Sequence, residues 1–492
     1  MSYFEPDADL LAASNAALKS INIGRLQPAA KTFDVHDPAT EEVIASLPDH
    51  TPEDALAALT KADAAGKAWA KTSPRKRSDV LHAVYAKLIE NKDTLAYVIS
   101  REMGKPLAEG YAEVQYSADY VRWFAEEALR AQGLYRDSPA GDATILVRRS
   151  PVGNAVLIAP WNFPMAMATR KIAPALAAGC ACVVKPANLT PLTTVIVLDL
   201  MIQAGVPEDL VQVITTTNAS GFSSTLLADQ RVRKISFTGS TPVGSTLMGL
   251  AAKNIVKSSM ELGGNAPLLV FDDADLDRAV EGAILAKMRN GGQTCVAANR
   301  MFIQEGIADA FVEKFTAAMA AHKLGNAMNK ETTLGPVIDD RAVARLQHLV
   351  DDAVAKGAIL LTGGKSPDRP GHYFEPTVLD NVPANADIAT NEIFGPVAAI
   401  TRFKTQEEVI EKANDTEFGL AAFVFTQDLD RAINVAEALE TGMVGINNGL
   451  LSNIAAPFGG VKASGTGREG GAEGLEEYQE IRYFTMKRRE TH

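Results

Sequence analysis

Between Pro151 and Lys253 the sequence alternates short apolar runs with amphipathic stretches, and this alternation limits the fold more than any other feature. Strand-like runs are expected at 155–159, 181–184, 211–215 and 234–237, and helical patterns at 164–178, 191–204, 220–228 and 241–253. Strand, helix and strand at this spacing are typical of a parallel sheet covered by helices. We therefore predict an α/β fold with a Rossmann-like, nucleotide-binding sheet in this part of the chain.

A second α/β section begins near Asn265. It has expected strands at 267–270 and 300–303 and expected helices at 276–290 and 307–324, and the alternation runs on to about residue 447. A turn signal at 139–142 predicts a hairpin within 133–150. The tail ends in the alternating stretch 481–484, and an edge strand at a chain end favours pairing with another subunit.

Composition excludes several classes of function. The 492 residues carry a net charge of -12, and an acidic surface repels phosphate backbones, so we expect no nucleic-acid partner. The sequence has no run of about 18 apolar residues, so we predict no membrane-spanning segment. Three cysteines cannot form a disulfide framework and the N-terminus does not resemble a signal peptide, so the prediction is a cytoplasmic protein. Cys180 and Cys182 have no nearby histidine, and we predict no metal site.

The segment Gly291-Gly292-Gln293-Thr294-Cys295 follows one of the expected helices. Glycines end a helix and permit a tight loop, so Cys295 can be presented to a pocket. A free cysteine is either a nucleophile or a small buried apolar residue, and this segment alone leaves both interpretations open. The match to G-x-G-x-x-G at 465–470 follows a loop and not a strand, so we reject it as a dinucleotide fingerprint.

Several motifs occur together in one order. They are Pro-Trp-Asn-Phe-Pro at 160–164, Lys-Pro-Ala at 185–187, Phe-Thr-Gly-Ser at 237–240, Glu-Leu-Gly-Gly at 261–264, Gly-Gln-Thr-Cys at 292–295, Glu-Ile-Phe-Gly-Pro at 392–396 and Pro-Phe-Gly-Gly at 457–460. In this order and approximate spacing they resemble the NAD(P)-dependent aldehyde dehydrogenase superfamily, and the resemblance spans essentially the whole chain.

The resemblance implies three catalytic residues. Cys295 would be the nucleophile that forms a thiohemiacetal and then a thioester. Asn162 would donate a hydrogen bond to the oxyanion, together with the backbone N–H of Cys295. Glu261 would be the general base that activates water for hydrolysis of the thioester. Its presence argues against the branch of the family that transfers the acyl group to coenzyme A, and the three residues together argue against a purely structural or binding role.

The resemblance also implies a dinucleotide site. Lys185 would contact the adenosine ribose, Glu392 the nicotinamide ribose, and Gly239 and Ser240 open a helix whose N-terminus faces the pyrophosphate. The remaining predicted cofactor-binding residues are Pro160, Trp161, Asn188 and Phe394. NAD-preferring relatives carry Glu at the position of Asn188. A neutral amide does not repel a 2′-phosphate, so we predict NADP as the preferred cofactor, with NAD as the second.

Four residues point to the substrate. Arg170, Arg289 and Ser452 match the positions that bind the distal carboxylate in succinate semialdehyde dehydrogenases, and Phe458 is predicted to line the same pocket. Two guanidinium groups and a hydroxyl form a sensible carboxylate clamp. We therefore predict oxidation of succinate semialdehyde, a small-molecule substrate. A broader semialdehyde or aromatic aldehyde dehydrogenase is the alternative, and the two arginines could instead serve structural ion pairs.

The resemblance predicts three domains. Residues 1–132 and 151–262 would bind the cofactor, residues 263–456 would form the catalytic domain, and 457–470 would return to the cofactor domain. Residues 133–150 and 471–492 would pair into an oligomerisation domain, which implies a homodimer or a homotetramer. Ala297 stands where some relatives have a second cysteine, so we predict no internal disulfide switch.

Overall fold

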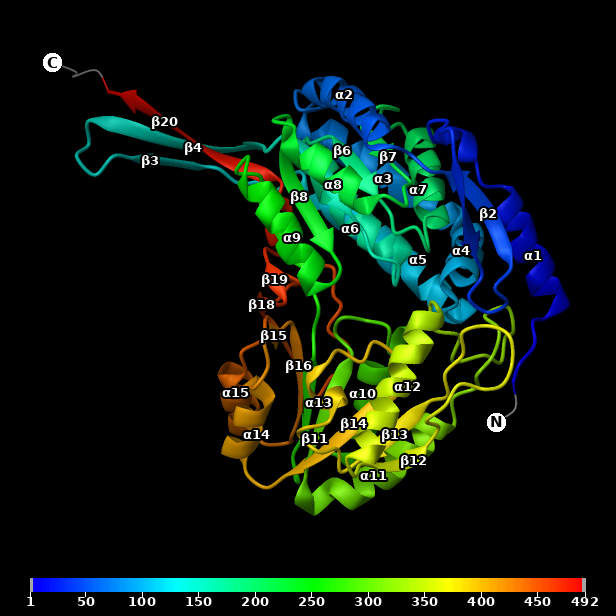
Figure 1. Cartoon of the computed structure of the whole chain (residues 1–492). Helices are drawn as coiled ribbons and strands as arrows, with labels where there is room; N and C mark the ends of the chain where they lie inside the picture. The colour runs from blue at the N-terminus through cyan, green and yellow to red at the C-terminus, as the bar shows by residue number, and fades with distance from the viewer. Residues whose placement is uncertain (1–2, 489–492) are drawn as a thin grey trace.

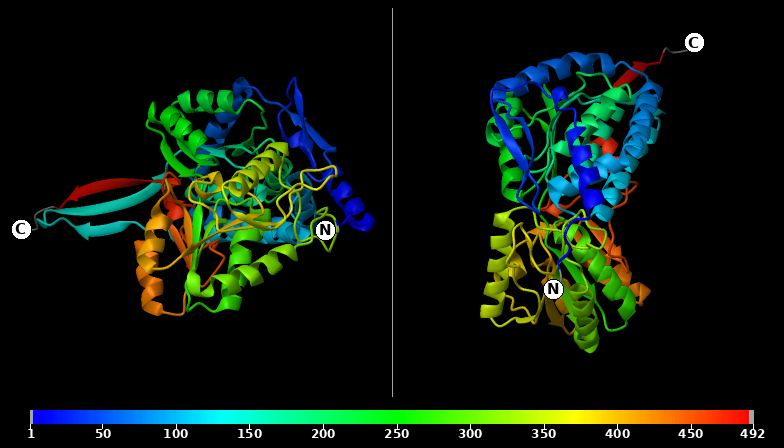
Figure 2. Two further views of the ribbon diagram at one scale, coloured as in Figure 1. Left: turned by 60° about the horizontal axis from the view of Figure 1, so that its bottom comes forward. Right: turned by 90° about the vertical axis from the view of Figure 1, so that its right-hand side faces the viewer.

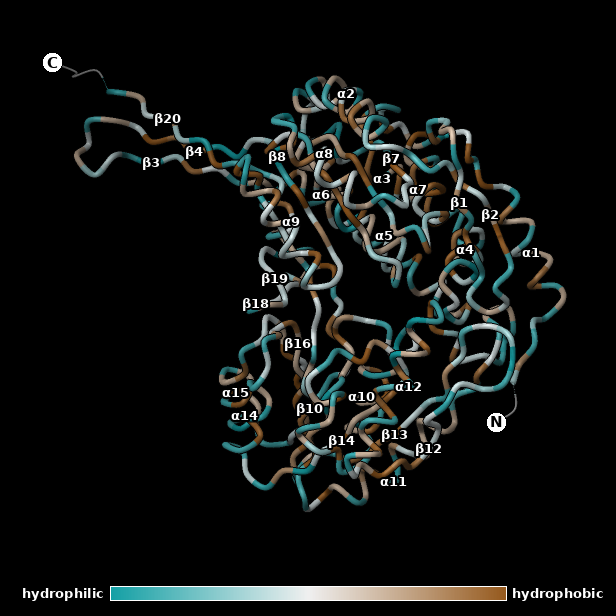
Figure 3. Tube along the Cα trace, in the orientation of Figure 1, coloured by the Kyte–Doolittle hydropathy of each residue, from teal (hydrophilic) through white to brown (hydrophobic). Residues whose placement is uncertain are grey.

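The computed structural model describes residues 3–488, and residues 1–2 and 489–492, at the ends of the predicted cofactor and oligomerisation domains, lie outside this range. Figure 1 shows two large lobes, each built around one sheet, and a narrow three-stranded sheet that projects from the upper lobe. The hydropathy trace in Figure 3 places many of the apolar segments on strands and helices in the interior of the lobes. The fold is α/β, as the sequence predicts.

The upper lobe contains a six-stranded sheet in the order β19-β9-β8-β5-β6-β7. Its parallel strands are β5 (Asn154–Ile158), β6 (Cys182–Lys185), β7 (Val211–Val213), β8 (Val232–Thr238) and β9 (Lys257–Glu261). Between them run α6 (Pro164–Ala178), α7 (Leu192–Gln203), α8 (Ala219–Ala228) and α9 (Thr241–Ala252). The predicted alternation is confirmed. The antiparallel edge strand β19 (Gly465–Thr466) comes from the C-terminal part of the chain.

The segment from residue 8 to residue 127 packs largely on this lobe. It forms the β1–β2 hairpin (Thr32–His36 and Val43–Pro48) and the helices α1 (Ala8–Lys19), η1 (Ile23–Arg25), α2 (Pro52–Trp69), α3 (Pro74–Glu90), α4 (Lys92–Met103) and α5 (Leu107–Glu127). Side chains of Thr51 and Ser73 accept backbone N–H groups at the starts of α2 and α3, each of which begins with proline. Asn91 divides the helical pattern of residues 75–103 into two helices.

The lower lobe contains a seven-stranded sheet in the order β12-β13-β14-β11-β10-β16-β17. Its strands are β10 (Ala266–Val270), β11 (Ala298–Gln304), β12 (Ile359–Thr362), β13 (Thr377–Asp380), β14 (Val397–Phe403), β16 (Ala421–Phe425) and β17 (Met443–Ile446), of which only β12 is antiparallel to its neighbour. The helices are α10 (Leu276–Met288), η2 (Arg289–Gly292), α11 (Glu305–Ala320), α12 (Asp340–Ala355), α13 (Asp387–Thr390), α14 (Gln406–Asn414) and α15 (Leu429–Ala438). The short elements β15 (Phe418–Gly419) and β18 (Val461–Lys462) pair with each other, and α16 (Glu473–Glu476) precedes the last strand.

The helix predicted over 276–290 ends earlier than expected, at Met288. Asn290 and Gly291 take left-handed backbone angles, with φ of 56° and 61°, inside the following turn η2. A helix cannot continue through such angles. The prediction was wrong at this boundary because an apolar pattern does not show where a non-glycine residue turns left-handed.

The projecting sheet consists of β3 (Leu134–Asp137), β4 (Ala143–Pro151) and β20 (Gln479–Lys487). β20 pairs antiparallel with β4 along its whole length, from Gln479 opposite Pro151 to Lys487 opposite Ala143. The hairpin and the tail therefore pair as predicted. Figure 2 shows the sheet extending well beyond the two lobes. Its side chains Tyr135, Ile481 and Tyr483 are more than 60% exposed.

None of the helices within residues 3–488 is long and apolar enough to cross a membrane. The same residues contain no group of three or more His, Cys, Asp and Glu side chains placed to hold a metal ion.

Candidate active site

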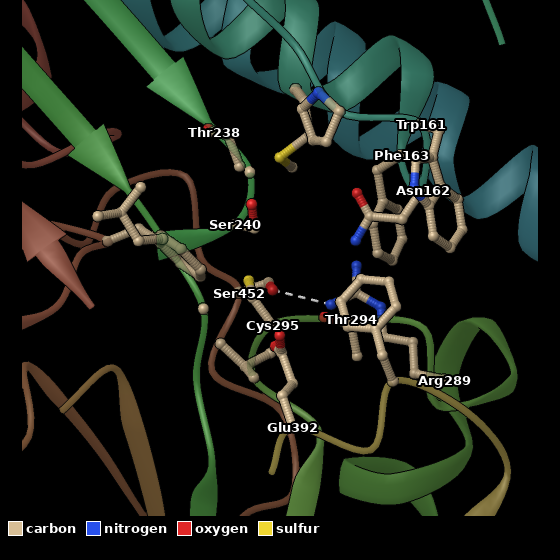
Figure 4. Close-up of a pocket in the computed structure, with 18 of the residues that line it drawn as sticks. Trp161, Asn162, Phe163, Thr238, Ser240, Arg289, Thr294, Cys295, Glu392 and Ser452 are labelled. Atoms are coloured by element: carbon tan, nitrogen blue, oxygen red, sulfur yellow. Dashed lines mark hydrogen bonds between the residues drawn. The ribbon is translucent and has the colours of Figure 1, made fainter. Parts of the chain in front are cut away.

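A cavity of about 220 Å³ lies where residues of the two lobes meet. The upper lobe contributes residues of α5, the loop before α6, α6 itself, and the segments after β8 and β9. The lower lobe contributes η2, the cysteine loop and later loops. Of the predicted site residues, the cavity is lined by Pro160, Trp161, Asn162, Arg170, Gly239, Ser240, Arg289, Cys295, Glu392, Phe394, Ser452 and Phe458. Figure 4 shows many of these side chains around one space.

Cys295 lies on a loop that close backbone contacts hold in place. A Cβ atom on Gly264 would overlap the carbonyl oxygen of Cys295, and one on Gly292 would overlap the carbonyl of Gly395. Gly292 also has a left-handed φ of 75°. These two glycines thus allow the loop to pack against the segments that follow β9 and Glu392. This packing explains the glycines at positions 264 and 292 in two of the sequence motifs.

The Cys295 thiol is half-buried in the cavity wall. Burial raises its pKa to about 12, and the positive charge of Arg170 only partly opposes this rise. In this state the sulfur is therefore held almost entirely as the thiol near neutral pH.

Asn162 stands in the loop between β5 and α6, with its side chain on the same cavity as Cys295. Its Nδ2 donates a hydrogen bond of 3.0 Å to the carbonyl oxygen of Gln293, two residues before the cysteine. This bond orients the amide nitrogen toward the cysteine loop, as Figure 4 shows. The second N–H of this amide is then available for an oxyanion on a carbon bound to sulfur.

Glu261, the last residue of β9, does not line the cavity. Its carboxyl group is buried, points toward the backbone of Gly459, and neither oxygen has a hydrogen-bond partner among the described residues. Burial, and then the negative charge of Glu469, raise the pKa of Glu261 well above its usual value. The prediction brought Glu261 and Cys295 together at one site, whereas here the carboxyl group lies behind the cavity wall.

Arg170 and Lys171, neighbours on α6, both pair with Glu469 in a fully buried cluster. Burial alone would raise the pKa of Glu469, but the two cations hold it below the usual value. Arg170 also stacks on the ring of Phe458, with 4.4 Å from Cζ to the ring centre. Glu469 lies inside the rejected G-x-G-x-x-G match, and no local pattern indicates that it reaches α6.

Arg289 has a different environment. Its Nη1 donates to Ser452 Oγ at 2.8 Å, the bond drawn as a dashed line in Figure 4. Its guanidinium lies 5.1 Å from the ring centre of Phe163 and 5.6 Å from that of Tyr116. Among residues 3–488 no carboxylate oxygen lies within 4.0 Å of its nitrogens. The predicted proximity of Arg289 and Ser452 is thus observed, and Tyr116 is a cavity residue that the sequence does not single out.

Comparison with known proteins agrees with this geometry. The family model described as "Aldehyde dehydrogenase family" matches residues 26–484. The chain belongs to the aldehyde dehydrogenase family. It is 51% identical to a succinate-semialdehyde dehydrogenase of Paenarthrobacter nicotinovorans, over 90% of this chain and 98% of the relative. It is 50% identical to a glutarate-semialdehyde dehydrogenase of Pseudomonas putida, over 93% of this chain and 94% of the relative. The crystal structure of an NADP-dependent enzyme of E. coli superposes with a TM-score of 0.93 at 46% identity, over 94% of this chain and 96% of that one.

An aldehyde dehydrogenase of this family is an NAD(P)-dependent oxidoreductase, and the described residues fit a dinucleotide. Glu392 accepts one hydrogen bond, from the Gly264 N–H at 3.2 Å, and forms no ion pair with any residue from 3 to 488, which leaves its carboxyl group open to hydroxyl donors. Burial raises its pKa to about 7. Ser240 precedes α9, and no side chain caps the N–H groups of the first turn, so an anionic pyrophosphate suits this end.

The adenosine end of the predicted dinucleotide site lies outside the cavity. Lys185 ends β6, and within the described part of the chain its Nζ donates to the Pro186 carbonyl at 3.2 Å and to Asn188 Oδ1 at 3.4 Å and has no ion-pair partner. Burial lowers its pKa to about 8. A buried ammonium without a carboxylate partner fits a role in binding ribose hydroxyls.

Near the other end, Trp161 meets Phe394 edge to face at 5.4 Å. Arg345 of α12, which no motif indicates, lines the cavity and donates to the Phe394 carbonyl at 3.3 Å.

Proposed function

We propose that this aldehyde dehydrogenase oxidises succinate semialdehyde to succinate and prefers NADP over NAD. The observation that carries this proposal is the Arg289–Ser452 pair, which places a cation without an ion-pair partner within 4.0 Å among residues 3–488, and a hydroxyl, in the wall of the cavity that holds Cys295. Ionised carboxylates are bound by such pairs through charge-assisted hydrogen bonds. The names of the relatives in Paenarthrobacter and Pseudomonas, both semialdehyde dehydrogenases, support a substrate with a carboxylate at one end and an aldehyde at the other.

In this proposal Arg170 has a secondary part in substrate binding. Glu469 already compensates its charge, but Arg170 still lines the cavity, and its Nη2 has no hydrogen-bond partner in the described part of the chain. Phe458 closes the same wall beneath the guanidinium. The main contact with the distal carboxylate is therefore assigned to Arg289 and Ser452, and the Nη2 group of Arg170 is assigned as an additional hydrogen-bond donor.

The chemistry would run on three side chains. The Cys295 sulfur, once it has lost its proton, attacks the aldehyde carbon, and Asn162 donates to the resulting oxyanion. A nicotinamide cofactor held by Glu392 and Ser240 would supply the hydride acceptor for this oxidation, and loss of hydride from the tetrahedral carbon would leave a thioester on Cys295. Glu261 then takes a proton from the water that hydrolyses the thioester. Because its carboxyl group lies behind the cavity wall, this step requires Glu261 to rotate toward Cys295.

The substrate assignment is tested by comparing kcat/KM for succinate semialdehyde and for butanal, an uncharged aldehyde of the same chain length. We expect a preference for the semialdehyde on the order of 10²-fold or more, because butanal leaves Arg289 without a charged partner. Equal values would overturn the proposal. Glutarate semialdehyde belongs in the same assay, since the Pseudomonas putida relative is nearly as similar as the Paenarthrobacter relative. A higher kcat/KM for glutarate semialdehyde would make it the proposed substrate in place of succinate semialdehyde.

The cofactor assignment depends on the neutral side chain of Asn188, which lies 3.4 Å from Lys185 Nζ at the end of β6. A carboxylate at this position would repel a 2′-phosphate and attract a 2′-hydroxyl. We expect Asn188→Glu to lower the ratio of kcat/KM with NADP to kcat/KM with NAD. An unchanged ratio would contradict the preference for NADP.

The domain boundaries and the assembly also belong to the proposal. The six-stranded sheet, which includes β19, supports a cofactor domain of residues 1–132, 151–262 and 457–470, and the seven-stranded sheet supports a catalytic domain of residues 263–456. Exposed apolar side chains on β3 and β20 support a homodimer or homotetramer assembled through the projecting sheet. Light scattering of the enzyme with and without Ile481→Lys would test this role. A lysine buried between subunits should weaken their association, so the measured molar mass should fall.

A further inference from the structure

Behind Asn162 lies a group of charged and amide side chains that is separate from the three predicted catalytic residues. Lys105 precedes α5, Glu109 and Glu113 lie one turn apart on α5, and Asn290 lies in the turn before Cys295. The side chains of Lys105 and Glu113 are completely buried and form an ion pair of 2.6 Å. Burying two charges costs a large desolvation free energy, so this ion pair must be offset by further hydrogen bonds or retained for a function.

Lys105 holds the main chain of Asn162. Its Nζ donates to the Asn162 carbonyl oxygen at 2.8 Å and lies 3.9 Å above the ring centre of Phe163. Glu113 accepts the Met165 and Ala166 N–H groups with its other oxygen, at 2.9 and 3.2 Å, and so fixes the first turn of α6. Asn162 is thus held at its own carbonyl group and through the first turn of the helix that follows it.

The same network reaches the cysteine loop. Glu109 accepts the backbone N–H of Asn290 at 2.9 Å. Asn290 Nδ2 donates at 3.0 Å both to the Asn162 carbonyl and to the Gln293 carbonyl, and the latter also accepts from Asn162 Nδ2. The start of α5 therefore contacts, through a few direct bonds, both the amide donor in the upper lobe and the loop of the nucleophile in the lower lobe.

We propose that Lys105 is a positioning residue which, together with Asn290, sets Asn162 at the correct place relative to Cys295 for stabilising the oxyanion. Lys105 touches neither the cavity nor the sulfur, so it acts through Asn162. The proposal depends on the assigned role of Asn162 as oxyanion donor and not on which aldehyde is the substrate. A misplacement of one ångström at such a donor costs up to about 10²-fold in rate.

The test is a double-mutant cycle with Lys105→Met and Asn162→Ala, read by single-turnover formation of NADPH from an aldehyde. We expect Lys105→Met to slow this step by about 10-fold to 10²-fold in the native background and to have no further effect when Asn162 is already alanine. Equal factors in both backgrounds would overturn the proposal. A normal single-turnover rate for Asn162→Ala alone would instead show that the assigned role of Asn162 is wrong.

A second readout separates positioning from general loosening of the site. Iodoacetamide alkylates Cys295 by forming a C–S bond with loss of iodide, and this reaction builds no oxyanion. We expect the alkylation rate of Lys105→Met to stay within about twofold of the native rate while NADPH formation slows. A parallel loss of both rates would show that the loop has only become disordered.

Two further variants keep the test decisive. Lys234→Met removes another buried lysine that pairs with a glutamate, at 2.9 Å from Glu477, and is the matched control expected to keep the native single-turnover rate. If Lys105→Met does not fold, Asn290→Gly carries the test: it removes both side-chain hydrogen bonds without removing a charge, and glycine suits the φ of 56°. It is expected to slow NADPH formation and to leave alkylation unchanged, and the opposite pattern would contradict the proposal.

Discussion

The two arginines of the cavity come from different lobes and have opposite electrostatic surroundings. Arg170, on α6, is fully buried, pairs with Glu469 and shares that carboxylate with Lys171. Arg289, in η2, is half-buried and contacts a neutral hydroxyl and two aromatic rings. Burial raises the pKa of the Glu109 carboxyl group and the charge of Arg289 partly opposes this rise, but the two side chains form no ion pair. The difference teaches that a cation near a substrate is free to bind it only where the protein has not already supplied the counter-charge.

The largest effect in this comparison is expected from Glu469→Gln. This change leaves two buried cations without their carboxylate, so the free energy of unfolding should fall by about 3–5 kcal/mol. Urea denaturation measures it, with Glu476→Gln as the control, because Glu476 is an exposed partner of Arg149. An unchanged urea midpoint would mean that Glu261 compensates the charges of Arg170 and Lys171, and Glu469 would then not distinguish Arg170 from Arg289.

The pH dependence of Cys295 alkylation sharpens the contrast. Since burial raises the thiol pKa to about 12, the thiolate fraction, and with it the iodoacetamide rate of the enzyme without cofactor, should rise about tenfold per pH unit from about pH 7 to about pH 10. Arg170 is the cation that most lowers this pKa, and Arg289 is not among its largest influences. Arg289→Met should therefore follow the same profile. A plateau below about pH 9 in either protein would contradict the burial of the thiol.

Arg289→Met should affect the substrate and not the fold. We expect kcat/KM for succinate semialdehyde to fall on the order of 10²-fold, because the carboxylate loses its charged partner, while kcat/KM for butanal stays nearly unchanged. Steady-state kinetics with both aldehydes measure this selectivity. Arg341→Met, which removes an exposed guanidinium paired with Asp339, is the control. An equal loss for both aldehydes would place Arg289 in a structural role.

The smallest effect is expected from Ser452→Ala. Its hydroxyl accepts one hydrogen bond from Arg289, so its loss should lower kcat/KM for succinate semialdehyde about 2-fold to 10-fold. The same assay with butanal should show no change. A loss as large as that of Arg289→Met would indicate that the hydroxyl, and not the guanidinium, makes the principal contact.

Much of the fold was predictable because hydrophobic periodicity is a local property. The alternation over 154–252 follows from patterns within single segments, whereas the pairing of the hairpin with the tail was implied by the resemblance to the family. The family motifs likewise placed Asn162, Cys295 and Glu392 at one cavity. What could not be predicted is long-range: Glu469 meets α6 across almost three hundred residues, and Asn290 turns left-handed because its N–H and amide are bound by Glu109 and by two carbonyl groups.

By itself, the sequence determined the α/β fold and the family and predicted Cys295 as the reactive sulfur, because these inferences depend on residue types at fixed spacings along the chain. The tertiary structure alone decided which arginine is compensated, where the Glu261 carboxyl group lies and what holds Asn162 opposite the cysteine loop. The physical reason is that charge compensation and hydrogen bonding depend on distances in space, and a buried group takes its properties from neighbours that the chain brings together only when it folds.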